Sequence, residues 1–215
     1  MPIEPVTPTC TDHPVFRPPD PDAPLWRYMD FARYVALLDR RALFFSSIRA
    51  FPDRFEGSLT SDLLASLEAL GPAQVEVWRN WPLMTYVNCW NEDSNESVAL
   101  WSMYTSSSGG VAIRSSASRI RQALEPDTSG LYPPDELYIG RVRYLDYSTA
   151  NIPGDNANWP VLHKRVAYSF EHEVRLALWP QRLLRAVEPN LAPGEQSGRG
   201  RRCGRSGWLR RRCRS

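Results

Sequence analysis

The sequence contains no apolar run that approaches the roughly 20 residues of a membrane-spanning helix, although 42% of its 215 residues are hydrophobic. Its first residues also lack the basic-then-apolar order of a secretory signal peptide. We therefore predict no membrane association and, by default, a cytoplasmic bacterial location. With eight Trp, nine Tyr and seven Phe, the chain has enough apolar area for one domain with a sizeable core.

Cysteine and histidine are both scarce. The four cysteines are widely scattered without a Cys-x-x-Cys pair. We therefore predict neither disulfides nor a metal site. We expect His13 to fall in a disordered segment, His163 to be exposed beside Lys164, and His172 to point away from the neighbouring glutamates. The sequence thus offers no candidate for a catalytic histidine.

Hydrophobic periodicity is almost missing from residues 1–24, which contain eight prolines. Proline removes a backbone donor and fixes φ, so such a segment favours an extended chain over a packed helix or strand. We predict a disordered, proline-rich leader over residues 1–24.

Lysine is nearly absent, because 25 arginines accompany the single Lys164. Eight of these arginines fall between Gly198 and Ser215, a stretch without acidic residues. If those eight charges are left out, the net charge of +2 becomes −6. A basic tail is typical of proteins that neutralise nucleic-acid phosphates, so nucleic acid stays open as a partner.

A shifted reading frame in GC-rich DNA is a different origin for this tail. With allowed codons, the five residues from Arg199 to Cys203 read one base forward as Val-Asp-Val-Asp-Ala, which alternates like a strand. We therefore predict that residues 186–215 are disordered and out of frame, and that the natural product continues in the other frame. A genuine basic tail is the alternative.

Between these ends, residues 25–185 carry the patterns of a single α+β domain. Strands are predicted at 25–29, 42–47, 84–91, 109–114, 137–147 and 170–179, and helices at 31–41, 60–70, 72–81, 96–104 and 116–124. Helices come early and strands late. We therefore expect a mixed sheet with flanking helices rather than a regularly alternating parallel fold.

The most informative segment runs from Phe170 to Trp179. As a strand it places Glu171, Glu173 and Arg175 on one face and three aliphatic side chains on the other. Two carboxylates and a guanidinium on one strand face form either a solvated row or a functional site.

Seven segments occur in a fixed order across residues 25–179. They are Leu-Trp-Arg-Tyr-Met-Asp, Ala-Leu-Phe-Phe-Ser-Ser, Phe-Pro-Asp-Arg-Phe-Glu-Gly-Ser, Cys-Trp-Asn-Glu, Leu-Trp-Ser-Met-Tyr, Gly-Val-Ala-Ile-Arg and Glu-His-Glu-Val-Arg-Leu. This series resembles the bacterial domain-of-unknown-function 2971 family. That family runs on into a further strand and helix where this chain becomes arginine-rich, which agrees with a shifted frame. The resemblance implies no settled activity.

A second resemblance, by analogy, concerns the order of polar residues. An arginine at the end of the first strand (Arg27), a later hydroxyl (Ser46 or Tyr104) and a late Glu-x-Glu pair (Glu171 and Glu173) look like the arrangement in ADP-ribosyltransferases. This resemblance implies NAD as the bound dinucleotide and a transferase activity in a defence or toxin system.

The same resemblance implies a role for each residue. Arg27 would bind the phosphates, Glu173 would hold the ribose and stabilise oxocarbenium-like charge, and Glu171 would assist the acceptor. The residues that would bind NAD are Arg27, Tyr28, Ser46 and Tyr104.

Structural roles are the alternative for these charged groups. Arg27 could pair with Asp53 or Glu56, and the late glutamates could pair with Arg141 and Arg143 on the preceding strand. The two loop carboxylates and a strand glutamate could also hold a divalent ion. The alternative function is a non-enzymatic or nucleic-acid-facing defence module, whose polar groups would be paired and would not surround a pocket.

Overall fold

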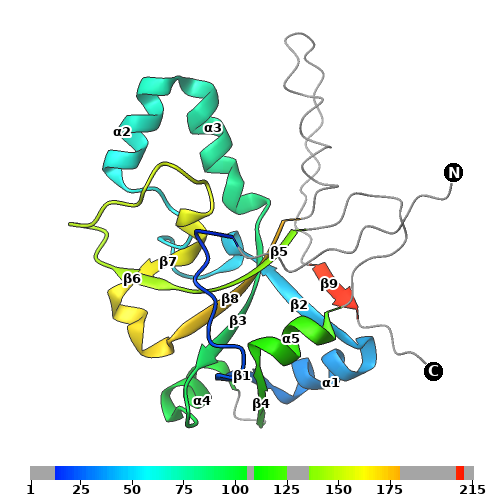
Figure 1. Ribbon diagram of the computed structural model, residues 1–215. Helices are drawn as coiled ribbons and strands as arrows, with labels where there is room; N and C mark the ends of the chain where they lie inside the picture. Colours follow the sequence, from blue (N-terminus) through cyan, green and yellow to red (C-terminus); the bar gives the residue numbers. More distant parts are fainter. Residues whose placement is uncertain (1–12, 106–108, 125–135, 180–206, 211–215) are drawn as a thin grey trace, which may run out of the picture.

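The computed structural model describes residues 13–105, 109–124, 136–179 and, for the backbone alone, 207–210. Seven strands form the main sheet and two more form a small separate sheet (Figure 1). The strands of the main sheet are β1 (Pro24–Asp30), β2 (Ala42–Ser47), β3 (Tyr86–Glu92), β4 (Gly110–Ser116), β5 (Glu136–Arg141), β8 (Glu173–Trp179) and β9 (Gly207–Arg210). The small sheet pairs β6 (Arg143–Leu145) with β7 (His163–Arg165).

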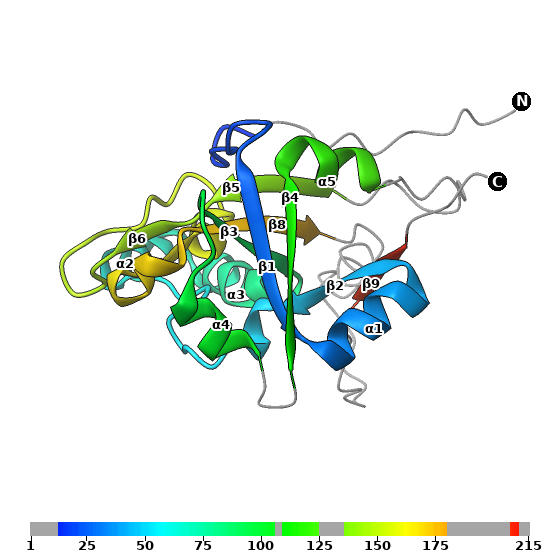
Figure 2. The same ribbon diagram turned by 90° about the horizontal axis from the view of Figure 1, so that it is seen from below.

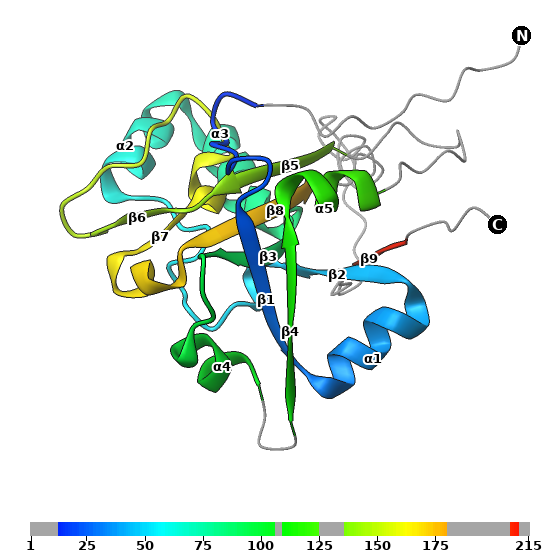
Figure 3. The ribbon, with the colours of Figure 1, turned by 60° about the horizontal axis from the view of Figure 1, so that its bottom comes forward.

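Five α-helices lie among the described residues, and they gather in separate regions around the sheet. They are α1 (Phe31–Arg40), α2 (Ser61–Leu70), α3 (Pro72–Asn80), α4 (Val98–Tyr104) and α5 (Ala117–Ala123). Figures 1 and 3 show α2 and α3 together, far from α1 and α5, and α4 beside β1. Within the described ranges, no helix combines the length and hydropathy of a membrane span.

The predicted α+β class is confirmed. All strand pairs of the main sheet are antiparallel. Among the described residues, parallel pairing occurs only between β6 and β7, so the main sheet is antiparallel rather than mixed as expected.

Local signals explain where several helices begin and end. The Asp30 carboxylate accepts a hydrogen bond from the Arg33 backbone N–H at 2.8 Å and caps α1. Arg41, with φ 48°, ends this helix in the left-handed region. Pro72 stands at the start of α3, where its missing N–H costs nothing. The Ser97 hydroxyl caps α4.

The main sheet divides at β3. One edge of β3 pairs with β8 from Tyr86 to Asn91. Along the other edge, β1 pairs with the last two residues of β3, and β2 pairs with the first two residues of β3. Figure 2 shows β1 and β4 crossing in front of β3, β5 and β8. Two side chains bridge the fork: Arg27 Nη1 donates to the Cys89 carbonyl oxygen at 2.9 Å, and Asn88 Nδ2 donates to that of Phe44 at 2.8 Å.

Two apolar clusters cover the two faces of β8. The three aliphatic residues predicted to share a face, Val174, Leu176 and Leu178, are buried in one cluster with part of α5. Ala177 and Trp179 belong to the other, with α2 and α3. The strand alternation was therefore correctly predicted, and it leaves Glu173 and Arg175 on the face of the second cluster.

The predicted disordered leader is wrong for its second half. Residues 1–12 lie outside the described residues, but Val15 and Phe16 are 5% and 4% exposed. The Phe16 ring stacks on Tyr138 at 5.2 Å and meets Trp179 edge-on at 5.7 Å. Proline excludes this segment from regular structure, yet its two apolar side chains can still close one end of the core.

Three other boundaries differ from the predictions. Gly207–Arg210 form β9 and pair with β2, so the tail is not wholly excluded from the fold; the rest of 186–215 lies outside the described residues. The predicted long strand at 137–147 is split into β5 and β6 around Val142. The last predicted strand begins at Glu173 rather than Phe170, because η4 (Val166–Glu171), a 3-10 helix, precedes it.

Candidate functional site

A cavity of about 400 Å³ opens at the fork of the sheet. Its walls come from β1, β2, β3, α4, η4, β8 and the loop after η1 (Ile48–Ala50). All six residues that the sequence nominated line this cavity: Arg27, Tyr28, Ser46, Tyr104, Glu171 and Glu173. The cavity volume lies at the lower end of the range typical of small-molecule sites, about 300–1,000 Å³.

The two glutamates converge for a different reason from the one predicted. Glu171 ends η4 and is not part of a strand. His172 then takes a left-handed conformation, with φ 40°, and Glu173 begins β8. This turn, rather than strand alternation, brings both carboxylates to one place. The His172 side chain is 58% exposed and lies 3.5 Å from Asp93.

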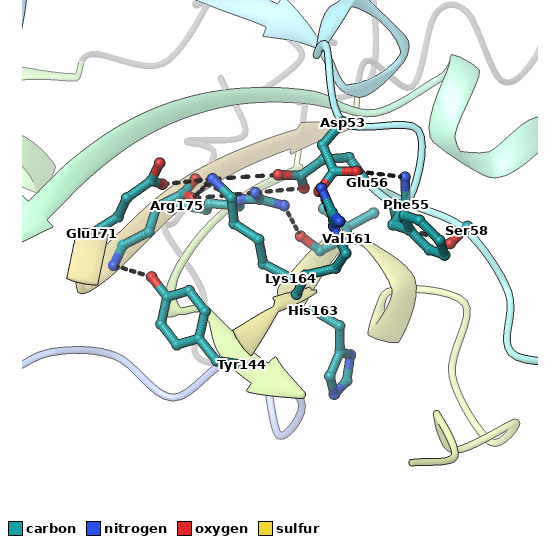
Figure 4. A network of polar contacts seen from close by, with 12 residues as sticks. Asp53, Phe55, Glu56, Ser58, Tyr144, Val161, His163, Lys164, Glu171 and Arg175 are labelled. Carbon is teal, nitrogen blue, oxygen red and sulfur yellow. Dashed lines mark hydrogen bonds and ion pairs between the residues drawn. The ribbon is translucent and has the colours of Figure 1, made fainter. Parts of the chain in front are cut away.

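Lys164 joins the glutamates, and the sequence prediction missed it. Its Nζ lies 2.5 Å from Glu171 Oε2, 2.9 Å from Glu173 Oε2 and 3.4 Å from Glu56 Oε1 (Figure 4). The expected exposure of His163 is wrong, because this residue is buried, as is Lys164. In Figure 4, His163 points away from the network. Its ring Nδ1 lies within hydrogen-bond distance of the Trp159 carbonyl oxygen.

Arg175 completes the network from β8. Its Nε donates to Glu173 Oε1 and its Nη2 to Glu56 Oε2, each at 2.7 Å. Its Nη1 donates to the Val161 carbonyl oxygen. The side chain is fully buried, and such a guanidinium needs this set of acceptors to offset its desolvation.

The network holds one more negative than positive charge, since three carboxylates face one ammonium and one guanidinium. Glu56 and Glu173 each contact both cations, whereas Glu171 contacts only Lys164. Glu171 is therefore the least compensated carboxylate. The physical chemistry of the cluster should make this residue the easiest to protonate.

The pKa values follow this charge distribution. Burial raises the pKa of Glu171, and Lys164 opposes this rise only in part. Burial would also raise the pKa of Glu173, but Arg175 and Lys164 together hold it well below the usual range. For Lys164, burial favours a lower pKa, yet the charges of the glutamates, Glu173 above all, raise it. The pKa values of the two glutamates are thus shifted in opposite directions, as in acid–base sites.

Tyr104 and Tyr28 stand in different relations to the cavity. Tyr104 is 42% exposed and its hydroxyl donates to Glu171 Oε1 at 3.1 Å. Burial of the hydroxyl and the charge of Glu171 raise the Tyr104 pKa. Tyr28 is 7% exposed, and its hydroxyl accepts from the Ser97 backbone N–H at 2.8 Å. Tyr28 therefore offers its ring to the cavity, while Tyr104 keeps a hydroxyl beside Glu171.

Arg27 does not make the ion pairs suggested as its structural role. Asp53 pairs with Arg165 at 2.8 Å, and Glu56 pairs with Arg175 and Lys164. Among the described residues, no carboxylate pairs with Arg27, whose only hydrogen bond goes to the Cys89 carbonyl oxygen. Burial lowers its pKa, but the group remains charged at neutral pH. A guanidinium with unused donors in a cavity wall suits an anionic ligand.

The pairing suggested for Arg141 and Arg143 is also wrong. Arg141 pairs with Glu92 at 2.6 Å rather than with the late glutamates. The Arg143 guanidinium lies 4.2 Å from the ring centre of Trp159. The carboxylates proposed for a divalent ion are occupied by cationic side chains. Among the described residues, no group of three or more potential ligands is arranged to hold a metal.

Cys89 lines the same cavity from β3 without being a reactive thiolate. Burial, reinforced by the charge of Glu173, raises the pKa of its thiol well above the usual value. A protonated thiol is a poor nucleophile.

Comparisons with known proteins give no relative for this chain. No family model, no curated protein and no solved structure matches it.

Proposed function

We propose that this cavity binds NAD and that the protein is an ADP-ribosyltransferase-like enzyme. One observation carries the proposal: an arginine without a carboxylate partner among the described residues lines the same cavity as two glutamates whose pKa values are shifted in opposite directions. The resemblance to the domain-of-unknown-function 2971 family is part of this proposal, with the enzyme acting in a defence or toxin setting.

The residues fit the parts of a dinucleotide. Arg27, from β1, has N–H groups for a phosphate that no described residue accepts from, and Arg33 of α1 also lines the cavity. The rings of Tyr28, Trp90 and Tyr104 offer apolar surface for the nicotinamide. Since the cavity volume is at the small end of the range for ligand sites, we expect it to enclose the nicotinamide–ribose half of the molecule.

The proposed reaction breaks the bond between the ribose C1′ and the nicotinamide nitrogen. Both bonding electrons leave with nicotinamide, and positive charge develops on the ribose. Glu173, which is kept ionised by Arg175 and Lys164, supplies fixed negative charge close to that position. The two cations reduce its field, so the excess negative charge of the cluster is what favours the transition state.

Glu171 has the complementary role. An acceptor oxygen, from a hydroxyl group or water, attacks C1′ and releases a proton to the Glu171 carboxylate. Its raised pKa makes this carboxylate a stronger base than an ordinary glutamate. The Tyr104 hydroxyl, bonded to the other carboxylate oxygen, orients it. These are the roles that the sequence resemblance implies.

Release of nicotinamide from NAD, measured by chromatography, tests the proposal. Glu171→Gln should reduce the rate roughly 10²–10⁴-fold, the usual contribution of a general base. Glu173→Gln should abolish release, provided that circular dichroism shows a folded protein. Glu68→Gln, an exposed change on α2, is the matched control and should keep the wild-type rate. Absence of release by the wild-type protein, with and without candidate acceptors, would refute the proposed activity.

A further inference from the structure

Asn91 carries a buried acceptor that no described residue satisfies. It lies on β3, is 5% exposed and lines the cavity. Its Nδ2 donates to the Glu171 carbonyl oxygen at 2.7 Å. Its Oδ1 is buried and has no hydrogen-bond partner within the described part of the chain. Native proteins rarely leave a buried side-chain oxygen unpaired, so this oxygen, in a residue that lines the cavity, is a candidate acceptor for a ligand donor.

The orientation of this amide is fixed by its surroundings. A carbonyl oxygen can only accept, so the atom that faces Glu171 O must be the amide nitrogen. Asn91 is also the direct cross-strand partner of Glu173, so the two side chains leave the sheet on the same face. Asn91 is therefore paired with Glu173 across the sheet, and its Nδ2 is bonded to the backbone oxygen of Glu171. Its Oδ1 is left without a partner among the described residues.

Asn88, on the same strand, differs from Asn91 in its hydrogen bonding. It is 1% exposed, but it does not line the cavity. Its Nδ2 donates to the Phe44 carbonyl oxygen, and its Oδ1 accepts from Trp90 Nε1 at 2.7 Å. Both polar side-chain atoms of Asn88 thus have a hydrogen-bond partner, whereas Asn91 Oδ1 has none among the described residues.

We propose that Asn91 Oδ1 accepts a hydrogen bond from the carboxamide N–H of nicotinamide and so determines specificity for it. This inference rests on the proposed function and names the group that is recognised. The carboxamide is the sole N–H donor of the nicotinamide moiety. The bond that breaks must lie beside Glu171 and Glu173, which places the attached ring within reach of their neighbour Asn91. A ligand that lacks this donor leaves Oδ1 unpaired and is rejected.

Calorimetric binding of two dinucleotides tests the inference without requiring turnover. The probes are NAD and its acetylpyridine analogue, in which an acetyl group replaces the carboxamide and the riboses are unchanged. The wild-type protein should bind NAD at least about tenfold more tightly than the analogue, as expected for one lost hydrogen bond to a buried group. Asn91→Leu should bring the ratio of the two dissociation constants close to one. Asn80→Leu, on α3, which contributes no residue to the cavity lining, is the control and should keep the wild-type ratio.

The outcomes separate this inference from the function on which it rests. If the wild-type protein binds NAD and the analogue equally, the carboxamide is not recognised and the inference fails while NAD binding stands. The same holds if Asn91→Leu keeps the wild-type ratio. Recognition of a ribose hydroxyl by Asn91 would give that equal binding, because the analogue retains both riboses. Absence of NAD binding by the wild-type protein would overturn both proposals.

Discussion

Replacing the single lysine, Lys164→Met, should destabilise the protein strongly. The Lys164 side chain is 8% exposed and contacts three carboxylates. Methionine has a similar length but no charge, so the cavity left behind is small and the loss is mainly electrostatic. Removing one partner of a buried ion pair typically costs about 3–5 kcal/mol, because the other partner remains buried and uncompensated. Whole domains have only about 5–15 kcal/mol of stability.

The size of the effect should depend on pH. With Lys164 absent, three carboxylates face Arg175 alone, and the excess negative charge rises from one to two. Lys164 would no longer oppose the effect of burial on Glu171, so the pKa of this residue in the folded protein should lie further above the unfolded value of about 4.3. A group with a raised folded-state pKa stabilises the fold below its unfolded pKa and loses that contribution as pH rises through the folded pKa. The deficit of Lys164→Met should therefore be larger at neutral pH than near pH 5.

Urea denaturation of the variant and the wild type at both pH values measures this deficit. Lys164→Arg, which keeps the charge, should lose less stability. The double variant Lys164→Met/Glu171→Gln restores an excess of one negative charge and should recover part of the loss, as a double-mutant cycle would show. A deficit below about 1 kcal/mol at neutral pH, where about 3–5 kcal/mol is expected, would refute this account of the network. A deficit independent of pH would do the same.

Three further perturbations follow from the same structure. Arg27→Met should raise the KM for NAD roughly 10–100-fold, as expected for lost charged hydrogen bonds. Arg119→Met, an exposed change on α5, should leave the KM unchanged. In steady-state kinetics, equal KM values for Arg27→Met and the wild type would mean that Arg27 does not bind substrate. Because burial raises the pKa of Glu171, kcat/KM should increase with pH through a midpoint above the ordinary glutamate value of about 4.3; a midpoint at or below that value in the pH–rate profile would contradict its role as the base. Phe16→Ala should lower the free energy of unfolding by about 3–5 kcal/mol; thermal and urea unfolding indistinguishable from wild type would mean that residues 13–24 do not pack on the core.

The features that the sequence predicts well are those that depend on local patterns. Alternation along Glu173–Trp179 predicts which side chains face each core, and the cap at Asp30 predicts the start of α1. Arg27 and the two glutamates were proposed as candidates from the order of the polar residues along the chain, not from geometry. That these residues line one cavity depends on how the sheet forks at β3.

The features that the sequence does not predict depend on contacts between distant segments. Lys164 sits in a polar His-Lys-Arg run that suggests a surface, yet three glutamates from two other segments surround it. Its being the only lysine in an arginine-rich chain was the one available signal. Glu171 was assigned to a strand because a 3-10 turn and a left-handed residue give no periodic pattern. Phe16 was missed because proline content hides an isolated apolar contact.

A crystal structure of the Glu171→Gln variant with NAD tests the central claim most directly, because this variant should bind NAD but turn it over slowly. We expect the nicotinamide in the cavity at the fork, with its ribose C1′ beside residues 171 and 173 and a phosphate on Arg27. NAD bound elsewhere on the protein, or a cavity without NAD at saturating concentration, would contradict the account.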